Sequence, residues 1–341
     1  MPNEEFSDQE QDLFEHYRFV ADPGQSPLRI DKFLMGRIEN ASRNKIQQAA
    51  TAGSILVNDK AVKQNYKVRP GDVITIVLTE PPRETEIIPE DIPIDIMFED
   101  DHIMVINKRA GMVVHPAFGN FTGTLVNALT YYLRQQSGND EAKPYLVHRI
   151  DKDTSGIMLV AKTELAQTRL AKEFFDHTID RKYTALVWGD MEEEEGTISG
   201  NLARHKNNRK LMTVYPDGET GKHAVTHWKV LERYGYVTLI ECILETGRTH
   251  QIRAHLKYIK HPLFNDAAYG GDQILKGTTF TRYRQFIKNC FGILPRQALH
   301  ARSLGLKHPV SGEKLFFDSD LATDMQEVIA KWEHYVVHQK E

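Results

Sequence analysis

The sequence predicts an α+β protein of two domains, in which a small helix-and-strand domain precedes a larger one built on a mainly antiparallel mixed β-sheet. Three observations lead to this prediction. The chain has 341 residues, of which 40% are hydrophobic, enough for two cores. Residues 80–93 are rich in proline and acidic side chains and lack apolar periodicity, as expected of an extended linker. Beyond them, the strand-like segments are joined by connections of varied length, unlike a regular βαβ array.

Composition narrows the class of protein further. Lys and Arg number 43 against 47 Asp and Glu, and the net charge of −4 is that of an ordinary globular protein. The two cysteines, Cys242 and Cys290, lie far apart, and the acidic N-terminus lacks the features of a secretory signal. No stretch approaches the roughly 18 apolar residues that span a membrane. We therefore expect a cytoplasmic protein without a membrane segment.

The first 80 residues divide into an acidic leader and a compact module. Residues 1–25 are acidic and predict a flexible leader, with a short helix around Phe14. From residue 26 to residue 80, helical apolar spacing from Leu28, a second helix capped by Ser42 and ended by Gly53, and strands at residues 55–57 and 73–78 predict an ααβ module. This module has the size of a binding domain.

Basic side chains predominate in the module, and Arg29, Arg43 and Lys45 are among them. Such a charge run is typical of either a solvated helix surface or a basic binding face. Segments 29–34, 42–43 and 53–58 resemble the S4 RNA-binding domain. The resemblance implies that structured RNA is the partner and that Arg29, Arg43 and Lys45 contact it.

The second domain is expected over residues 94–330, after a linker at 81–93 and before a C-terminal tail at 331–341. Periodicity predicts helices near residues 125–133 and 165–175. It predicts strands at residues 103–106, 113–114, 157–160, 183–188, 225–231 and 237–244. No internal repeat is present.

The segment from residue 147 to residue 156 carries the densest set of polar side chains and leads into a buried strand. Residues 153–156 are typical turn formers. Asp151 stands beside His148, Arg149 and Lys152, and nearby cations keep a carboxylate ionised, which suits a nucleophile or a base. The alternative is a surface ion pair without a catalytic role.

Two further segments carry candidate site residues. Residues 244–255 include Arg248, His250 and Arg253, which could be metal ligands, phosphate contacts or charge partners. The spacing of five between His250 and His255 is unlike common zinc pairs, so an arginine clamp is favoured and no metal is expected. Tyr183, on a predicted strand, suits either the core or stacking on a base.

In this order, the segments at residues 107–111, 148–156, 181–183 and 246–253 resemble the motifs of the RluA-type pseudouridine synthases. The last of these is a helix in that family. Arg109 stands where the family has proline, and Ile150 stands where it has leucine, and neither position carries a reactive group.

The resemblance implies an enzyme that isomerises uridine to pseudouridine in RNA without a cofactor. It implies Asp151 as the catalytic carboxylate, Arg253 as its partner and Tyr183 as a ring stacked on uracil. His148, Arg149, Arg248 and His250 would then contact the flipped nucleotide. With the S4-like module, it implies large-subunit (23S) ribosomal RNA as the substrate, and a monomer without an obligate protein partner.

A basic stretch at residues 204–210 lies between two predicted strands and includes Arg204, Lys206 and Arg209. It is either a solvated hairpin tip or a contact to RNA phosphates, and RNA binding is favoured. Two rival functions stay open. One is an RNA-binding protein without catalysis, and the other is a hydrolase that releases uracil with Asp153 as a second carboxylate.

Overall fold

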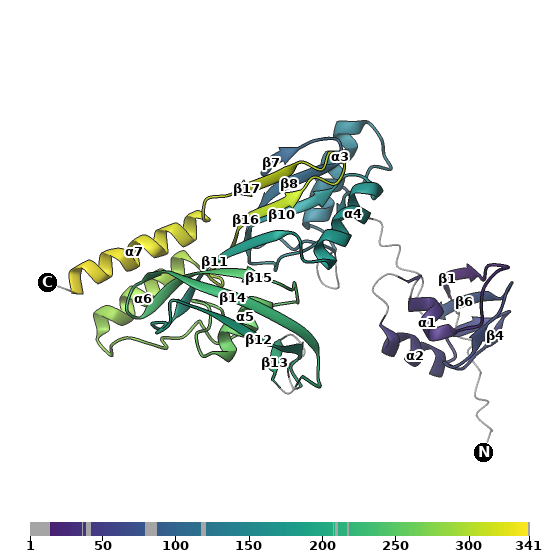
Figure 1. Cartoon of the computed structure of the whole chain (residues 1–341), viewed down its shortest axis with the longest axis horizontal. Helices are drawn as coiled ribbons and strands as arrows, with labels where there is room; N and C mark the ends of the chain where they lie inside the picture. The colour runs from purple at the N-terminus through teal and green to yellow at the C-terminus, as the bar shows by residue number, and fades with distance from the viewer. Residues whose placement is uncertain are drawn as a thin grey trace, which may run out of the picture. The chain divides into compact units, whose positions relative to one another are not determined.

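The computed structural model describes residues 14–35, 37–38, 42–78, 87–116, 121–206, 208, 211–216 and 218–339. The chain forms two compact units, Met1–Glu86 and Ile87–Glu341 (Figure 1). No helix in these ranges combines the length and apolar character required to cross a membrane. The unit boundary lies earlier than the end of the expected linker, because residues 87–93 belong to the second unit.

The first unit packs two short helices, α1 (Ile30–Met35) and α2 (Arg43–Thr51), on an antiparallel sheet. Ser42 caps α2 as expected, because its hydroxyl accepts a hydrogen bond from the Lys45 amide. Apolar residues from both helices and the sheet, among them Ile30, Phe33 and Ile74, form its core. The sheet has the order β1 (Phe14–Val20), β6 (Val73–Leu78), β3 (Ile55–Val57), β4 (Lys60–Ala61), and β2 (Leu28–Arg29) pairs separately with β5 (Lys67–Val68).

The short helix expected around Phe14 is wrong, because residues 14–20 form strand β1. This strand runs antiparallel to β6, with Phe19 opposite Ile74 and Val20 opposite Val73. Pairing with β6 satisfies the backbone of a segment whose own sequence has weak preferences, and Phe19 packs against the core. The leader as far as residue 13 lies outside the described residues.

The second unit is built on a sheet of eleven strands. Within the described ranges, β10 and β16 are the one parallel pair, and every other pair is antiparallel, which confirms the expected mixed sheet. The main path is β13 (Met212–Tyr215), β12 (Glu195–Arg204), β14 (Lys222–Arg233), β15 (Val237–Leu244), β11 (Asp180–Trp188), β16 (Leu299–Lys307), β10 (Ser155–Ala161), β8 (Ile103–Lys108), β7 (Ile96–Glu99), with β17 (Lys314–Asp318) beside β16 and β9 (Tyr145–Leu146) beside β10.

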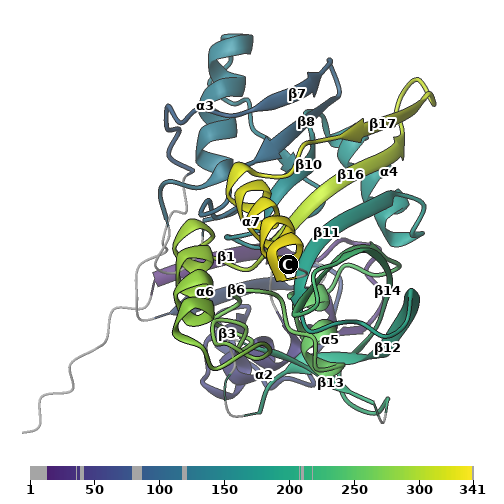
Figure 2. The same ribbon diagram turned by 90° about the vertical axis from the view of Figure 1, so that its left-hand side faces the viewer.

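Alternation along β11 separates the two faces of this sheet. Tyr183, Ala185 and Val187 pack into the same core as α3 (Leu125–Ser137) and α5 (Gln251–Tyr258). Leu186 and Trp188 face the opposite core, which α6 (Thr281–Ile293) and α7 (Thr323–Gln339) cover. Those two helices lie side by side (Figure 2). The remaining helix, α4 (Glu164–Phe175), packs on β10.

Three boundaries differ from the expectations. The tail predicted from residue 331 continues α7, and Trp332 is fully buried in the core beneath it. Residues 81–86 of the predicted linker lie outside the described residues, whereas residues 87–93 lie against α3, where Asn127 Nδ2 donates to the Ile88 carbonyl at 2.8 Å. Val113 and Val114 form no strand, and their carbonyls instead accept hydrogen bonds from the first amides of α3.

Candidate active site

A cavity of about 430 Å³ opens between the loop that precedes β10, the start of β11 and the N-terminal end of α5. Its volume is in the range of small-molecule sites, roughly 300–1,000 Å³. Asp151 is the one carboxylate among the described residues that line it. The other polar side chains of the lining are cationic or hydrogen-bonding groups: His148, Arg149, Thr154, His177, Arg181, Tyr183, Arg248, His250, Gln251 and Arg253.

Asp151 is joined to Arg253 across 102 positions of sequence. Arg253 Nη1 donates to Asp151 Oδ2 at 3.0 Å, which is the contact that the family resemblance implies. The side chain of Asp151 is 20% exposed, whereas that of Arg253 is 9% exposed. The carboxylate therefore faces the cavity while its partner is held within the protein.

Arg253 is itself fixed by Asp266, a fully buried carboxylate. Arg253 donates from Nε and Nη2 to both Asp266 oxygens, at 2.7 and 2.8 Å. The Tyr269 ring lies 5.0 Å from the guanidinium, and the Tyr269 amide donates to Asp266 at 3.3 Å. Although burial opposes it, pairing with Asp266 and Asp151 raises the pKa of Arg253 above its ordinary value. The site thus contains a permanent, rigid cation beside Asp151.

His250 immediately precedes α5 and adopts a left-handed conformation with φ of 52°. The helix expected from residue 246 therefore begins only at Gln251. His250 Nδ1 lies 3.0 Å from the Tyr269 hydroxyl, and its Nε2 lies 3.8 Å from Asp151 Oδ2. Burial lowers the pKa of His250, so its ring is neutral at neutral pH. His255 points elsewhere, to the Thr226 hydroxyl at 2.9 Å, so these two histidines do not converge.

Tyr183 lines the cavity from β11 and is 7% exposed. Its ring lies on the sheet face that packs against α5, which explains its proximity to Asp151 and Arg253. Burial raises the pKa of the Tyr183 hydroxyl, so that it stays protonated. A planar ring with a hydrogen-bonding tip is therefore available at the cavity wall.

The loop that carries Asp151 is tied to the protein on both sides. Lys108 is buried and donates from Nζ to the carbonyls of Arg109, Met112 and Lys152 at 2.8, 3.0 and 2.9 Å. Burial lowers the pKa of Lys108 to about 7. These contacts satisfy three backbone carbonyls next to the reactive loop and restrict its position.

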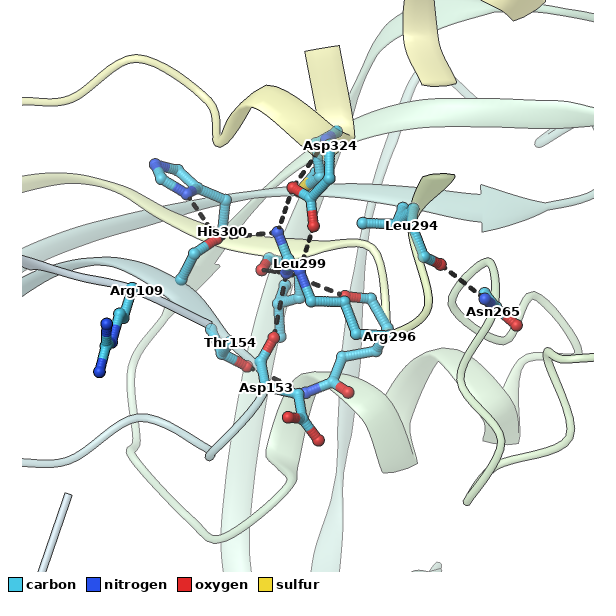
Figure 3. A network of polar contacts seen from close by, with 12 residues as sticks. Arg109, Asp153, Thr154, Asn265, Leu294, Arg296, Leu299, His300 and Asp324 are labelled. Carbon is cyan, nitrogen blue, oxygen red and sulfur yellow. Dashed lines mark hydrogen bonds and ion pairs between the residues drawn. The ribbon is translucent and has the colours of Figure 1, made fainter. Parts of the chain in front are cut away.

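Arg296 holds the far side of the same loop (Figure 3). Its Nη1 donates to the Asp153 carbonyl at 3.0 Å, and its Nε and Nη2 both donate to Asp324 at 2.7 Å. Asp324 is in the first turn of α7. The C-terminal helix, which the sequence interpretation placed partly in a tail, therefore contributes to the geometry of the Asp151 loop.

The predicted contact residues fall in three places. His148, Arg149, Arg248 and His250 line the cavity. His148 also accepts the Leu159 amide on Nε2 at 2.8 Å, so it helps to hold the loop against β10. Arg204 and Lys206 are exposed at the end of β12, where the neighbouring strand approaches the site through the Met212 amide and the Tyr269 hydroxyl, 2.9 Å apart. Arg209 lies outside the described residues.

Arg29 and Arg43 in the first unit have a structural partner. Both donate to the buried carboxylate of Asp31, at 2.8 and 3.1 Å. Burial acts to raise the pKa of Asp31, but hydrogen bonds from Arg29, Gln47 and Arg43 lower it to about 2. Lys45 is exposed in the first turn of α2. Two of the three predicted RNA contacts thus also stabilise the unit.

Sequence reasoning assigned no role to several residues that build the site. Asp266 and Tyr269 lie within a segment that is part of the family pattern, and only their contacts with Arg253 reveal what they do. Lys108, Arg181 and Arg296 were equally unassigned.

The buried His300 next to this loop provides a test of pH dependence. Its Nδ1 and Nε2 lie 2.9 Å from the hydroxyls of Ser155 and Ser319, and burial lowers its pKa from 6.5 to about 4. The unfolded chain binds this proton more strongly, so the contribution to stability is complete above pH 6.5 and is lost as the pH falls toward 4.

One proton corresponds to a slope of about 1.4 kcal/mol per pH unit. We expect His300→Gln to reduce the slope of the free energy of unfolding against pH by that amount between pH 6 and pH 4.5. Urea unfolding at several pH values measures it. An unchanged slope would contradict the buried neutral imidazole.

The second unit is thus a mixed sheet with a cavity in which one carboxylate stands among arginines in the described lining, an arrangement typical of an enzyme that acts on an anionic substrate. Comparison with known proteins narrows this class. Residues 28–74 match the S4 domain, and residues 102–258 match the RNA pseudouridylate synthase family.

The chain is 45% identical over 311 residues to an uncharacterized RNA pseudouridine synthase of Chlorobaculum parvum, covering 90% of this chain and 94% of that protein. It is 41% identical over 308 residues to the ribosomal large subunit pseudouridine synthase D of Zymomonas mobilis, covering 87% and 92%. The fold resembles that of human RNA pseudouridylate synthase domain containing 4, with a TM-score of 0.55, 23% identity, and 70% and 93% of the two chains covered. The chain belongs to the RluA family of RNA pseudouridine synthases with an N-terminal S4 domain, and it is an isomerase.

Proposed function

We propose that this pseudouridine synthase modifies specific uridines of large-subunit (23S) ribosomal RNA, with Asp151 as its catalytic carboxylate. The single observation that carries the catalytic assignment is the contact of Asp151, the one carboxylate of the cavity lining among the described residues, with the buried Arg253. The substrate assignment rests on similarity to several proteins named ribosomal large subunit pseudouridine synthase D, at 39–41% identity.

The reaction breaks the bond between N1 of uracil and C1′ of ribose, turns the base, and joins C5 to C1′. A proton leaves C5 and N1 gains one, so no atom of a co-substrate is consumed. Asp151 acts either by attacking C1′ or as the base that generates a glycal. Both routes need the carboxylate to be correctly aimed at the ribose, and the 3.0 Å contact with Arg253 orients it.

The remaining cavity residues hold the base and the nucleotide. The Tyr183 ring stacks on uracil while the base turns, and its hydroxyl assists proton removal from C5. Arg149 and Arg248, both exposed at the cavity, contact the flipped nucleotide. The target uridine must leave its stack to reach Asp151, because the cavity lies between structural elements of the second unit.

The first unit and the β12–β13 hairpin supply RNA affinity. The match to the S4 domain implies RNA binding, and Lys45 in the first unit and Lys206 in the hairpin are exposed cations available to phosphates. A uracil-releasing hydrolase is the weaker interpretation, because glycosidases use two carboxylates and Asp153 does not line the main cavity.

The test is to incubate the purified protein, without added nucleotide or metal, with unmodified large-subunit ribosomal RNA. Pseudouridines are then mapped by carbodiimide-dependent reverse-transcription stops. We expect stops at one or a few loop uridines, and none with Asp151→Asn. Stops in transfer RNA instead would overturn the substrate assignment and leave the activity intact.

A further inference from the structure

Arg181 is a buried cation for which the described residues provide no acceptor. It lies on β11 two positions before Tyr183, on the same face, and it lines the cavity. Arg181 is only 7% exposed, and its Nε is buried without a hydrogen-bond partner. No hydrogen bond or ion pair joins this guanidinium to any side chain or carbonyl that the structure describes.

The contrast with the other buried arginines is clear. Arg181, Arg253 and Arg296 are the three buried arginines within the described ranges. Arg253 donates two hydrogen bonds to Asp266, and Arg296 donates two to Asp324. Burying a charge is costly unless it is paired, and a carboxylate offsets this cost for two of the arginines, whereas Arg181 faces the cavity with its Nε buried and without a partner.

The surroundings hold Arg181 in place without neutralising it. The Phe174 ring lies 5.2 Å from the guanidinium carbon, and His148 stacks on that ring at 4.7 Å. Burial, aided by Arg181, lowers the pKa of His148 to about 3, so the imidazole is neutral and neither pairs with nor repels the arginine. At Gly247, a Cβ atom would lie 3.1 Å from Arg181 Nη1, so the absence of a side chain there leaves room for the guanidinium.

We infer that Arg181 binds a backbone phosphate of the RNA at the target nucleotide, an inference that rests on the proposed function. A guanidinium that lines a cavity and has no acceptor among the described residues is available to an anion, and its planar N–H groups fit two phosphate oxygens. Asp151, the one carboxylate of the described cavity lining, is already paired with Arg253. The anion that reaches Arg181 must therefore come from the substrate, and phosphate is the anionic group of RNA.

If Arg181 binds phosphate, its removal should not lower the stability of the protein, whereas the loss of a packing residue would. Replacing Arg181 by Met removes an unpaired buried charge and keeps the contact with Phe174, so we expect Tm to be unchanged or higher. Pseudouridine formation should fall at least about tenfold in kcat/KM, the loss typical of one charged contact. The kcat/KM of Arg181→Lys should lie between that of wild type and that of Arg181→Met. Arg282→Met, at an exposed position of α6, is the control and should leave activity unchanged.

The ligand itself is tested with nucleotides, independently of which RNA is the substrate. Uridine, uridine 3′-monophosphate and uridine 5′-monophosphate are titrated into the full-length protein by calorimetry. At least one monophosphate should bind wild type several-fold more tightly than uridine, and Arg181→Met should abolish that difference. Equal affinity for uridine and both monophosphates, or an undiminished difference in Arg181→Met, overturns the phosphate site.

The RNA experiment separates this inference from the proposed function. Methylphosphonate linkages, which lack the charge, are placed on either side of the target uridine in a ribosomal RNA fragment. One of them should reduce wild-type kcat/KM as much as Arg181→Met does, and should add no further loss in that variant. Additive losses overturn the inference. If wild type forms no pseudouridine in any ribosomal RNA, the substrate assignment is overturned, and the nucleotide titration still decides the role of Arg181.

Discussion

Replacing Asp151 by Asn is expected to reduce pseudouridine formation by at least about 10³-fold, because the amide can neither attack C1′ nor accept a proton. RNA affinity should stay within severalfold of wild type. Binding depends on many phosphate contacts, and Asp151 is a single anionic side chain within a mostly cationic cavity. Single-turnover kinetics on the mapped ribosomal RNA fragment and filter binding at a fixed salt concentration measure the two quantities.

Asp153→Asn is the matched control for this experiment. It makes the same change two positions away, on a side chain that does not line the 430 Å³ cavity. Arg296 contacts the backbone carbonyl of Asp153, so the substitution leaves that hydrogen bond in place. Asp153 is half-buried, and we expect Asp153→Asn to retain activity within about threefold, because it keeps the size of the side chain and the loop contact through the backbone carbonyl. Equal losses in both variants would favour a two-carboxylate reaction. Loss of RNA binding or of folding in Asp151→Asn would indicate a structural aspartate.

The second large effect is expected at Arg253. Replacing it by Met leaves the buried Asp266 without a cationic partner and releases Asp151 from its 3.0 Å contact. Removing one partner of a buried ion pair costs about 3–5 kcal/mol of stability. Turnover should be lost as well, because Asp151 then loses the contact that orients its carboxylate. Urea unfolding and the pseudouridine assay measure both effects.

A double variant separates the two consequences. Arg253→Met with Asp266→Asn removes the isolated buried charge, so it should recover part of the stability but none of the activity. Arg302→Met is the control, since Arg302 forms a similar two-bond pair with Asp318 that is partly exposed. Such pairs contribute about 1 kcal/mol or less. Stability of Arg253→Met close to that of Arg302→Met would contradict the buried network.

Much of the architecture follows from local features of the sequence. Alternating or continuous apolar residues identified β10, β11 and β15, and Ser42 identified the start of α2. These predictions hold because strand and helix periods and capping hydrogen bonds involve residues a few positions apart. Strand β1 and helices α6 and α7 were not predicted, because β1 depends on pairing with β6 and the two helices depend on the burial of residues such as Tyr283 and Trp332.

The features of the active site likewise include some that local sequence predicts and others that depend on tertiary contacts. The position of Asp151 in a polar loop before a buried strand can be predicted from local sequence, and the motifs indicate the family. The folded chain was needed to see that Asp266 and Tyr269 hold Arg253, that α7 reaches the loop through Arg296, and that Arg181 Nε is buried without an acceptor. The reason is that the energy of a charge depends on its burial and on the distances to its partners in space, and sequence separation specifies neither.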